Sequence, residues 1–242
     1  MTSDQISDQI SDQISGRTSG QRITTLVFDY GGVLTNPLEE TFYLFCKAVG
    51  ISPLQLREAM VSSAREHRAE PMAELEVAAI TEDDMIKRLA AYLPEGTLDR
   101  LEGKPFGEWW FKGRRTETAV VAAIAGFRER GYTTALLTNN VREWEPRWRA
   151  QVDTDALFDV VVDSSRERVR KPAPEIYRRL LERLGKPASE CLMVDDLEEN
   201  CAAARDLGFS AVLWTSADAS LPEIEAVLVA GAAPAPVTEG AS

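Results

Sequence analysis

Short apolar runs alternate with helix-forming stretches along most of the chain, and this alternation constrains the fold more than any other feature. Each apolar run is bounded by turn or polar residues, and each helical pattern ends at a glycine suited to a helix C-terminus. The apolar runs are residues 23–28, 134–138, 160–162, 191–194 and 211–214, and the helical patterns are residues 117–130, 174–184 and 197–207. This order predicts an α/β fold, a doubly wound Rossmann-like parallel sheet.

One long stretch, residues 38–112, interrupts the alternation because its pattern is helical throughout. Within it, Thr81-Glu82-Asp83-Asp84 has the sequence of a capped helix start, and that helix is expected to end near Leu93. The stretch predicts a small inserted helical cap. It leaves the main domain directly after the loop at Asp29, so we expect it to close over the carboxyl ends of the strands, where open α/β sheets bind ligands.

The length and composition fit one main domain with a smaller insertion. With 242 residues, of which 44% are apolar, the chain can form one sizeable core but not two large ones. The predicted core comprises residues 22–37 and 113–229, and the cap residues 38–112. Residues 1–21, which repeat Ser-Asp-Gln-Ile, and residues 230–242, rich in Ala, Pro and Gly, predict disordered tails.

The charge and the cysteines narrow the range of partners. A net charge of −12 argues against a nucleic-acid or membrane partner, because either would be repelled by most of the surface. The three cysteines, Cys46, Cys191 and Cys201, lack the spacing of a disulfide framework or a zinc site. No secretory-signal pattern and no apolar run of about 18 residues is present. We therefore expect a cytoplasmic protein with a small-molecule partner, and the sequence makes no prediction of oligomeric state.

Three carboxylates follow predicted strands and so are expected to meet at one edge of the sheet. They are Asp29, Asp195 and Asp196. Such a group would repel itself unless a hard, oxygen-seeking cation lay between its members. Lys171, which precedes a predicted helix, supplies a countercharge for an anionic substrate. The sequence therefore predicts a site for magnesium and phosphate.

Four short motifs occur in a fixed order, each at a predicted strand end or helix start. They are Phe28-Asp29-Tyr30-Gly31-Gly32-Val33, Leu137-Thr138-Asn139-Asn140, Arg170-Lys171-Pro172, and Val194-Asp195-Asp196 with Asn200. Together they resemble the motifs of the haloacid dehalogenase superfamily of hydrolases, and the resemblance covers residues 22–215. Residues 171–177 and 204–208 are similar to bacterial sugar-phosphate phosphatases and to the N-terminal phosphatase domain of soluble epoxide hydrolase.

The resemblance implies a magnesium-dependent phosphatase that acts on a small phosphorylated metabolite. Asp29 is then the nucleophile, which forms an aspartyl-phosphate and divides one difficult displacement into two steps. Lys171 neutralises charge on the nucleophile and on the transferring group. Thr138, Asn139 and Lys171 are the implied phosphate-binding residues.

The resemblance also implies the metal ligands. Mg²⁺ is expected to be held by Asp29, by the backbone carbonyl of Gly31 and by Asp196. Asp195 is expected to act through a bound water, or to support these ligands without contacting the metal itself. Asn200 is expected to orient Lys171 or the carboxylates of the motifs.

Gly31 departs from the common phosphatase pattern. That pattern has an aspartate two residues after the nucleophile, which protonates the leaving group and later activates water. Losing such a group typically costs about 10²- to 10⁴-fold in rate. The departure favours substrates with good leaving groups, or an acid supplied by the cap. His67, the only histidine, lies in a charged stretch and is interpreted as a solvated residue, although it remains a candidate for that acid.

Two alternative functions remain open. Dehalogenases of the 2-haloacid type also lack the second aspartate, but they work without metal and do not have the acidic pair Asp195-Asp196. A catalytically weak pseudo-enzyme that binds a phosphorylated ligand is compatible with Gly31 and with the repeated N-terminal tract.

Overall fold

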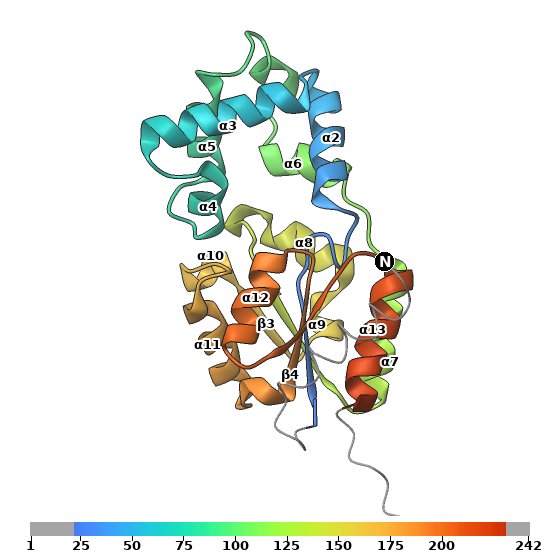
Figure 1. Ribbon diagram of the computed structural model, residues 1–242. Coiled ribbons are helices and arrows are strands. Elements are labelled where there is room, and N and C mark those ends of the chain that lie inside the picture. The colour runs from blue at the N-terminus through green and yellow to red at the C-terminus, as the bar shows by residue number, and fades with distance from the viewer. Residues whose placement is uncertain (1–21, 231–242) are drawn as a thin grey trace, which may run out of the picture.

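The computed structural model describes residues 22–230, which form a sheet-based core and a helical region above it (Figure 1). The tail predicted for residues 1–21 lies outside the described residues, as does the tail predicted for residues 230–242 except for Ala230, which ends the last helix. No helix within the described part of the chain is long and apolar enough to cross a membrane.

Five parallel strands form the sheet, in the spatial order β3-β2-β1-β4-β5. They are β1 (Thr25–Phe28), β2 (Thr133–Thr138), β3 (Val160–Asp163), β4 (Cys191–Asp195) and β5 (Ser210–Leu213). The central strand β1 pairs Phe28 with Leu136 of β2 and with Val194 of β4. All residues of β1 and β4 are buried, as expected for a parallel sheet covered on both faces. The predicted Rossmann-like α/β fold is confirmed.

Alternate strand residues point to opposite faces of the sheet and meet different helices. The helices are α7 (Thr118–Glu129), α11 (Pro174–Leu184), α12 (Glu198–Asp206) and α13 (Ala217–Ala230). Val27 belongs to an apolar cluster that includes side chains of α11 and α12. Its neighbour Leu26 belongs to a second cluster that includes side chains of α7 and α13. The two-residue period of the strands thus produces a three-layer core.

The segment between β1 and α7 forms the helical region at the top of Figure 1. Its elements are α2 (Leu38–Val49), α3 (Pro53–His67), α4 (Pro71–Glu76), α5 (Glu82–Ala90), the 3₁₀ turn η1 (Leu98–Leu101) and α6 (Phe106–Lys112). Thr81 and Asp84 form the expected capping box of α5, which ends at Ala90 rather than near Leu93. Below, we call residues 38–112 the cap.

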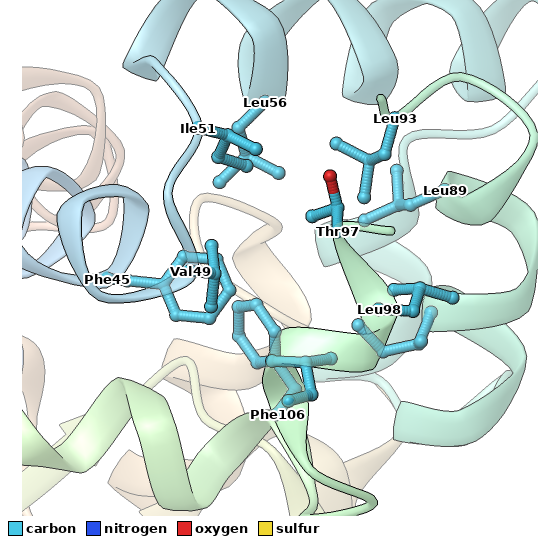
Figure 2. A pocket seen from close by; sticks show the side chains of 11 residues that line it. Phe45, Val49, Ile51, Leu56, Leu89, Leu93, Thr97, Leu98 and Phe106 are labelled. Carbon is cyan, nitrogen blue, oxygen red and sulfur yellow. The ribbon is translucent and has the colours of Figure 1, made fainter. Parts of the chain in front are cut away.

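The cap has an apolar interior of its own. Figure 2 shows side chains from its helices, among them Phe45, Leu56 and Leu89, around a small pocket. The pocket measures about 10 Å³, and Thr97 is the one polar residue in its lining. A volume of this size holds at most about one water molecule. We therefore interpret it as a packing gap in the cap rather than as a ligand site.

Two linkers join the cap to the core and lie side by side. Thr35 on the outgoing linker forms an antiparallel bridge with Thr116 on the returning one. The Asn36 backbone N–H donates to the carbonyl of Arg115, at 3.0 Å, and the Arg115 N–H donates to Asn36 Oδ1, at 2.7 Å. These bonds hold the two chain crossings together where the cap begins.

The helices between β2 and α11 were not predicted from the sequence. They are η2 (Arg142–Trp144), α8 (Glu145–Val152), α9 (Thr154–Leu157) and α10 (Ser164–Glu167). They are short, so they offer little periodicity, and α8 is stabilised by burial of Trp148. Helix α10 also contacts the cap, because Ser164 Oγ donates to the backbone carbonyl of Glu76 at 2.6 Å and accepts from the Asn140 N–H at 3.0 Å.

The hydroxyl of Ser164 is therefore expected to stabilise the cap against the core. Ser164→Ala leaves the Asn140 N–H and the Glu76 carbonyl without this partner and should lower the free energy of unfolding by about 1–3 kcal/mol. It should also speed proteolysis within the cap. Ser165→Ala is the matched control, because that hydroxyl donates to Asp163 inside the core. Equal cleavage rates in the two variants would contradict the expectation.

Candidate active site

The predicted site residues meet at the carboxyl edge of the sheet. Asp29 directly follows β1, and its backbone N–H donates to the carbonyl of Val194 at 2.9 Å. Thr138 is the last residue of β2, and Asp195 is the last residue of β4. Because these three strands are adjacent and parallel, their ends converge. Lys171 reaches the same place from the loop before α11.

Lys171 bridges two of the three carboxylates. Its Nζ lies 2.8 Å from Asp29 Oδ1 and 2.6 Å from Asp195 Oδ2, and its side chain is 1% exposed. Burial alone would lower the pKa of Lys171, but Asp195 and Asp29 together raise it above its ordinary value. The ammonium therefore stays charged in the interior, held between two anions.

Asp195 uses both carboxylate oxygens within the protein. Oδ2 contacts Lys171, while Oδ1 accepts from the Leu197 N–H at 3.0 Å and from Asn200 Nδ2 at 2.8 Å. Asn200 is itself buried. The structure thus brings Asn200 to the carboxylate that orients Lys171, and the sequence had left open which of the two it contacts.

Asp196 completes a cluster of acids with Asp29 and Asp195. The three residues offer oxygen atoms that all lie within 4.8 Å of one another. Among residues 22–230, Asp196 Oδ1 is buried without a hydrogen-bond partner. Gly32, at φ +80°, permits the close approach of Asp196, because a Cβ on residue 32 would lie 2.1 Å from Asp196 Oδ2. An unpartnered oxygen within three clustered acids fits a divalent cation, since a hard cation satisfies the oxygen and neutralises the repulsion.

The pKa values of these acids reflect the same crowding. Burial raises the pKa of Asp196 to about 7, with further contributions from the charges of Asp29 and Asp195. Burial also raises the pKa of Asp29 to about 6, although Lys171 opposes the shift. Without a cation, the anionic forms of both groups are therefore disfavoured.

The two polar residues at the end of β2 differ in their contacts. Thr138 is 1% exposed, and its Oγ1 accepts from Asn140 Nδ2 at 3.4 Å. Asn139 Nδ2 donates to the carbonyl of Lys171 at 3.0 Å, and the Lys171 N–H donates to Asn139 Oδ1 at 2.8 Å. Asn139 thus fastens the backbone of Lys171, a contact that sequence reasoning missed because it joins two distant motifs.

A cavity of about 240 Å³ lies over the acidic cluster, between the strand ends and the cap. Asp29, Gly31, Asn139, Lys171, Asp196 and Asn200 line it from the core. The cap contributes apolar side chains, among them Leu38 and Trp110. The size and the mixed lining suit a small ligand with a charged end and a less polar end.

Three charged residues in the cavity lining were not predicted as site residues. They are Glu76 at the end of α4, Arg114 on the returning linker, and Arg170 beside Lys171. No motif marks Glu76 or Arg114, since the fold alone brings them to the strand ends. His67, by contrast, is exposed at the end of α3 and is not part of the lining.

The fold thus places three clustered acids and a buried lysine at the carboxyl edge of a parallel sheet, beneath a helical cap. A family model for haloacid dehalogenase-like hydrolases matches residues 23–208, and the chain belongs to that family. The resemblance recognised in the four motifs is confirmed.

Several characterised relatives match a part of the chain. Acyl-CoA dehydrogenase family member 10 of Mus musculus is 36% identical over 106 residues, which are 44% of this chain and 10% of the mouse protein. Bifunctional epoxide hydrolase 2 of Sus scrofa is 30% identical over 45% of this chain and 20% of its own length. Glyceraldehyde 3-phosphate phosphatase of Pyrococcus abyssi is 35% identical over 35% of this chain and 36% of its own. The matches thus span a minor part of each relative.

Solved structures share the fold over most of the chain. A haloacid dehalogenase family enzyme from Bacteroides thetaiotaomicron, in complex with magnesium and inorganic phosphate, has a TM-score of 0.60 at 21% identity. That comparison covers 80% of this chain and 94% of the other. L-2-haloacid dehalogenase from Xanthobacter autotrophicus has a TM-score of 0.56 at 19% identity, over 84% and 83% of the two chains. The TM-scores establish a shared fold, and at identities this low the likeness shows the fold alone.

Removing the ammonium of Lys171 should destabilise the protein strongly. Lys171→Met leaves two buried carboxylates without their countercharge, which is expected to cost about 3–5 kcal/mol in the free energy of unfolding. Lys186→Met is the control, because Lys186 pairs with Glu190 at the surface and should cost about 0–1 kcal/mol. Urea denaturation measures both values. Equal losses in the free energy of unfolding would show that the buried ion pairs of Lys171 do not stabilise the fold more than a surface pair does.

Asp196→Asn should have the opposite effect in metal-free protein. The folded-state pKa of Asp196 is raised from 3.8 to about 7, so folding favours the protonated form, and stability falls as pH rises through this interval. In EDTA at pH 8 the neutral amide should therefore raise the free energy of unfolding by on the order of 2 kcal/mol. Below pH 4 the variant and the parent should be alike. A loss of stability at pH 8 would contradict this assignment.

Proposed function

We propose that the protein is a magnesium-dependent phosphatase that hydrolyses small phosphate monoesters through an aspartyl-phosphate on Asp29. The observation that carries the proposal is the position of Lys171, in contact with Asp29 beside an acidic cluster that has an unpartnered oxygen on Asp196. The cluster suits a divalent cation, and the ammonium suits the phosphoryl group that the cation would help to bind.

The proposed metal ligands are Asp29, the backbone carbonyl of Gly31 and Asp196. The arrangement supports a direct role for Asp196, since its Oδ1 lacks any other partner. Asp195 is proposed to act through a bound water, or to support the ligands without contacting the metal itself, because both of its oxygens accept hydrogen bonds from protein donors. Bound magnesium would supply positive charge to the phosphoryl oxygens as the substrate reacts.

The chemistry of the chain itself begins at Asp29. Its pKa of about 6 leaves it mainly ionised at neutral pH, and Lys171 holds one of its oxygens. In the first step the carboxylate attacks phosphorus, the new P–O bond forms, and the bond to the leaving group breaks. In the second step a water oxygen bonds to phosphorus, the bond to Asp29 breaks, and inorganic phosphate leaves. Lys171 neutralises charge throughout. Thr138 and Asn139 are proposed to bind the phosphoryl oxygens; Asn139 lines the cavity, while Thr138 lies beneath the lining.

The cavity and the relatives support a small phosphorylated substrate. About 240 Å³ admits a small metabolite but excludes a folded macromolecule. A relative over part of the chain is a glyceraldehyde 3-phosphate phosphatase, which is consistent with monoester chemistry. We propose that the protein acts in the cytoplasm on such a metabolite.

A dehalogenase function is the second candidate, and one observation favours it: Gly31 replaces the second aspartate of phosphatases. The acidic cluster argues against it, because carbon–halogen hydrolysis of this type needs no metal. The two functions are separable by their products. Halide release from 2-chloropropionate that persists in EDTA would replace the phosphatase proposal.

Asp29→Asn should abolish phosphate release. The amide is a poor nucleophile and a poorer magnesium ligand, so we expect a loss of at least about 10³-fold in kcat. The assay uses p-nitrophenyl phosphate and sugar phosphates, with magnesium or with EDTA. Asp163→Asn is the matched control at a neighbouring strand end, outside the cavity lining, and should retain activity. If the parent protein releases phosphate from none of the esters while it still binds magnesium, the pseudo-enzyme alternative replaces this proposal.

A further inference from the structure

Phosphate ester cleavage needs a proton for the leaving group, and residue 31 does not supply it. Gly31 lines the cavity without a side chain. Three residues in the lining, within the described part of the chain, carry carboxyl groups: Asp29, Asp196 and Glu76. The first two are the proposed nucleophile and metal ligand. Glu76 is the carboxyl group that this mechanism has not yet used.

The position of Glu76 is fixed by contacts between the cap and the core. It is the last residue of α4, and its backbone carbonyl accepts from Ser164 Oγ at 2.6 Å. Arg168 Nη1 donates to the carbonyl of Ala78, two residues further along. The end of the helix is therefore attached to the core at two neighbouring points, which fixes the position of Glu76 relative to the core.

The carboxyl group of Glu76 is enclosed but not saturated with donors. Its side chain is 16% exposed, and Oε2 lies 2.8 Å from Nε of Arg170. The contact lacks hydrogen-bond geometry, and both atoms are buried without a hydrogen-bond partner among the described residues. The charge of Arg170 thus holds the carboxyl in place while leaving an oxygen able to donate or accept a proton.

The ionisation of Glu76 agrees with this position. The pKa of Glu76 is raised to about 7, mainly by burial and also by the charges of Asp29 and Glu70, while Arg170 and Lys171 oppose the shift. The other charged groups in the cavity lining are Arg114 and Asp196. A carboxyl group with a pKa near the working pH populates both forms, as an acid that must become a base requires.

Building on the proposed phosphatase function, we propose that Glu76 of the cap is the general acid and base that replaces the missing aspartate at position 31. In the first step, protonated Glu76 gives its proton to the leaving-group oxygen as Asp29 bonds to phosphorus and the ester bond breaks. In the second step, ionised Glu76 takes a proton from the attacking water. The water oxygen bonds to phosphorus, the bond to Asp29 breaks, and inorganic phosphate leaves.

The ion pair with Arg170 also permits a purely structural role for Glu76, in which it only holds the cap against the core. The two roles differ in their dependence on the leaving group. Loss of a purely structural contact should affect all substrates alike and should act mainly through KM. A proton donor matters for a poor leaving group such as an alkoxide and little for p-nitrophenolate, which departs without a proton.

The test compares Glu76→Gln with the parent on p-nitrophenyl phosphate and on glycerol phosphate. We expect kcat for glycerol phosphate to fall by about 10²-fold or more and kcat for p-nitrophenyl phosphate by less than about 3-fold. The limb of the pH profile near 7 should disappear for glycerol phosphate, and the magnesium dependence should not change. Glu74→Gln is the matched control: Glu74 lies on the same helix, pairs with Arg88 at 2.6 Å, and does not line the cavity.

A second variant restores the missing group. Gly31 does not have a positive φ, and a Cβ there would lie 3.3 Å from Arg114 Nη2 and 3.5 Å from Leu38 Cδ2, so a side chain fits after small shifts. Gly31→Asp added to Glu76→Gln should recover turnover of glycerol phosphate. A double variant that cleaves p-nitrophenyl phosphate but shows no such recovery would contradict the proposal.

The possible outcomes distinguish failure of the phosphatase function from failure of the proposed role of Glu76. A parent enzyme that releases no phosphate from either ester overturns the phosphatase function itself. An active parent in which Glu76→Gln lowers both activities equally, or weakens magnesium dependence, overturns only the role of Glu76 as acid and base. Loss confined to glycerol phosphate supports the proposal.

Discussion

The bridge that Lys171 forms between Asp29 and Asp195 is the interaction on which the rest of the site depends. An ammonium and two carboxylates are buried together, which is tolerable only because each charge lies within 2.8 Å of an opposite one. Asn139 fixes the backbone of Lys171, and Asn200 fixes Asp195. Asp196 then adds a further negative charge, and its Oδ1 has no hydrogen-bond partner in the part of the chain that the structure describes. The protein carries an excess of negative charge at this edge, and a divalent cation is the simplest way to balance it.

The core and the cap contribute different parts of the chemistry. The core supplies the nucleophile and the acids from the strand ends and the ammonium from the loop before α11, all held by bonds that do not involve the cap. The cap covers this cluster, encloses a cavity of about 240 Å³ and adds Glu76 to its lining. Water exclusion by a closed cap strengthens the electrostatic interactions beneath it. On this account, the cap places the proposed proton donor over the phosphoryl site.

The sequence was sufficient to predict the fold and the position of the cluster, because both follow from local patterns. Five apolar runs gave the strands, and polar residues directly after them, such as Asp29 and Asp195, had to converge at one edge. It was insufficient for α8 to α10, whose short helices depend on burial of residues such as Trp148. Glu76 and Arg114 also could not be found, since only the three-dimensional placement of the cap and of the linker that returns from it brings them to the strand ends.

The most direct test of the acidic cluster is a calorimetric titration of metal-free protein with magnesium, repeated in buffers of different ionisation enthalpy. The account predicts that binding near pH 6.5 releases protons, because Asp29 and Asp196 have raised pKa values and must ionise to bind the cation. It also predicts that Asp196→Asn weakens binding strongly. Absence of magnesium binding in the parent protein, or binding unchanged by Asp196→Asn, would contradict the account.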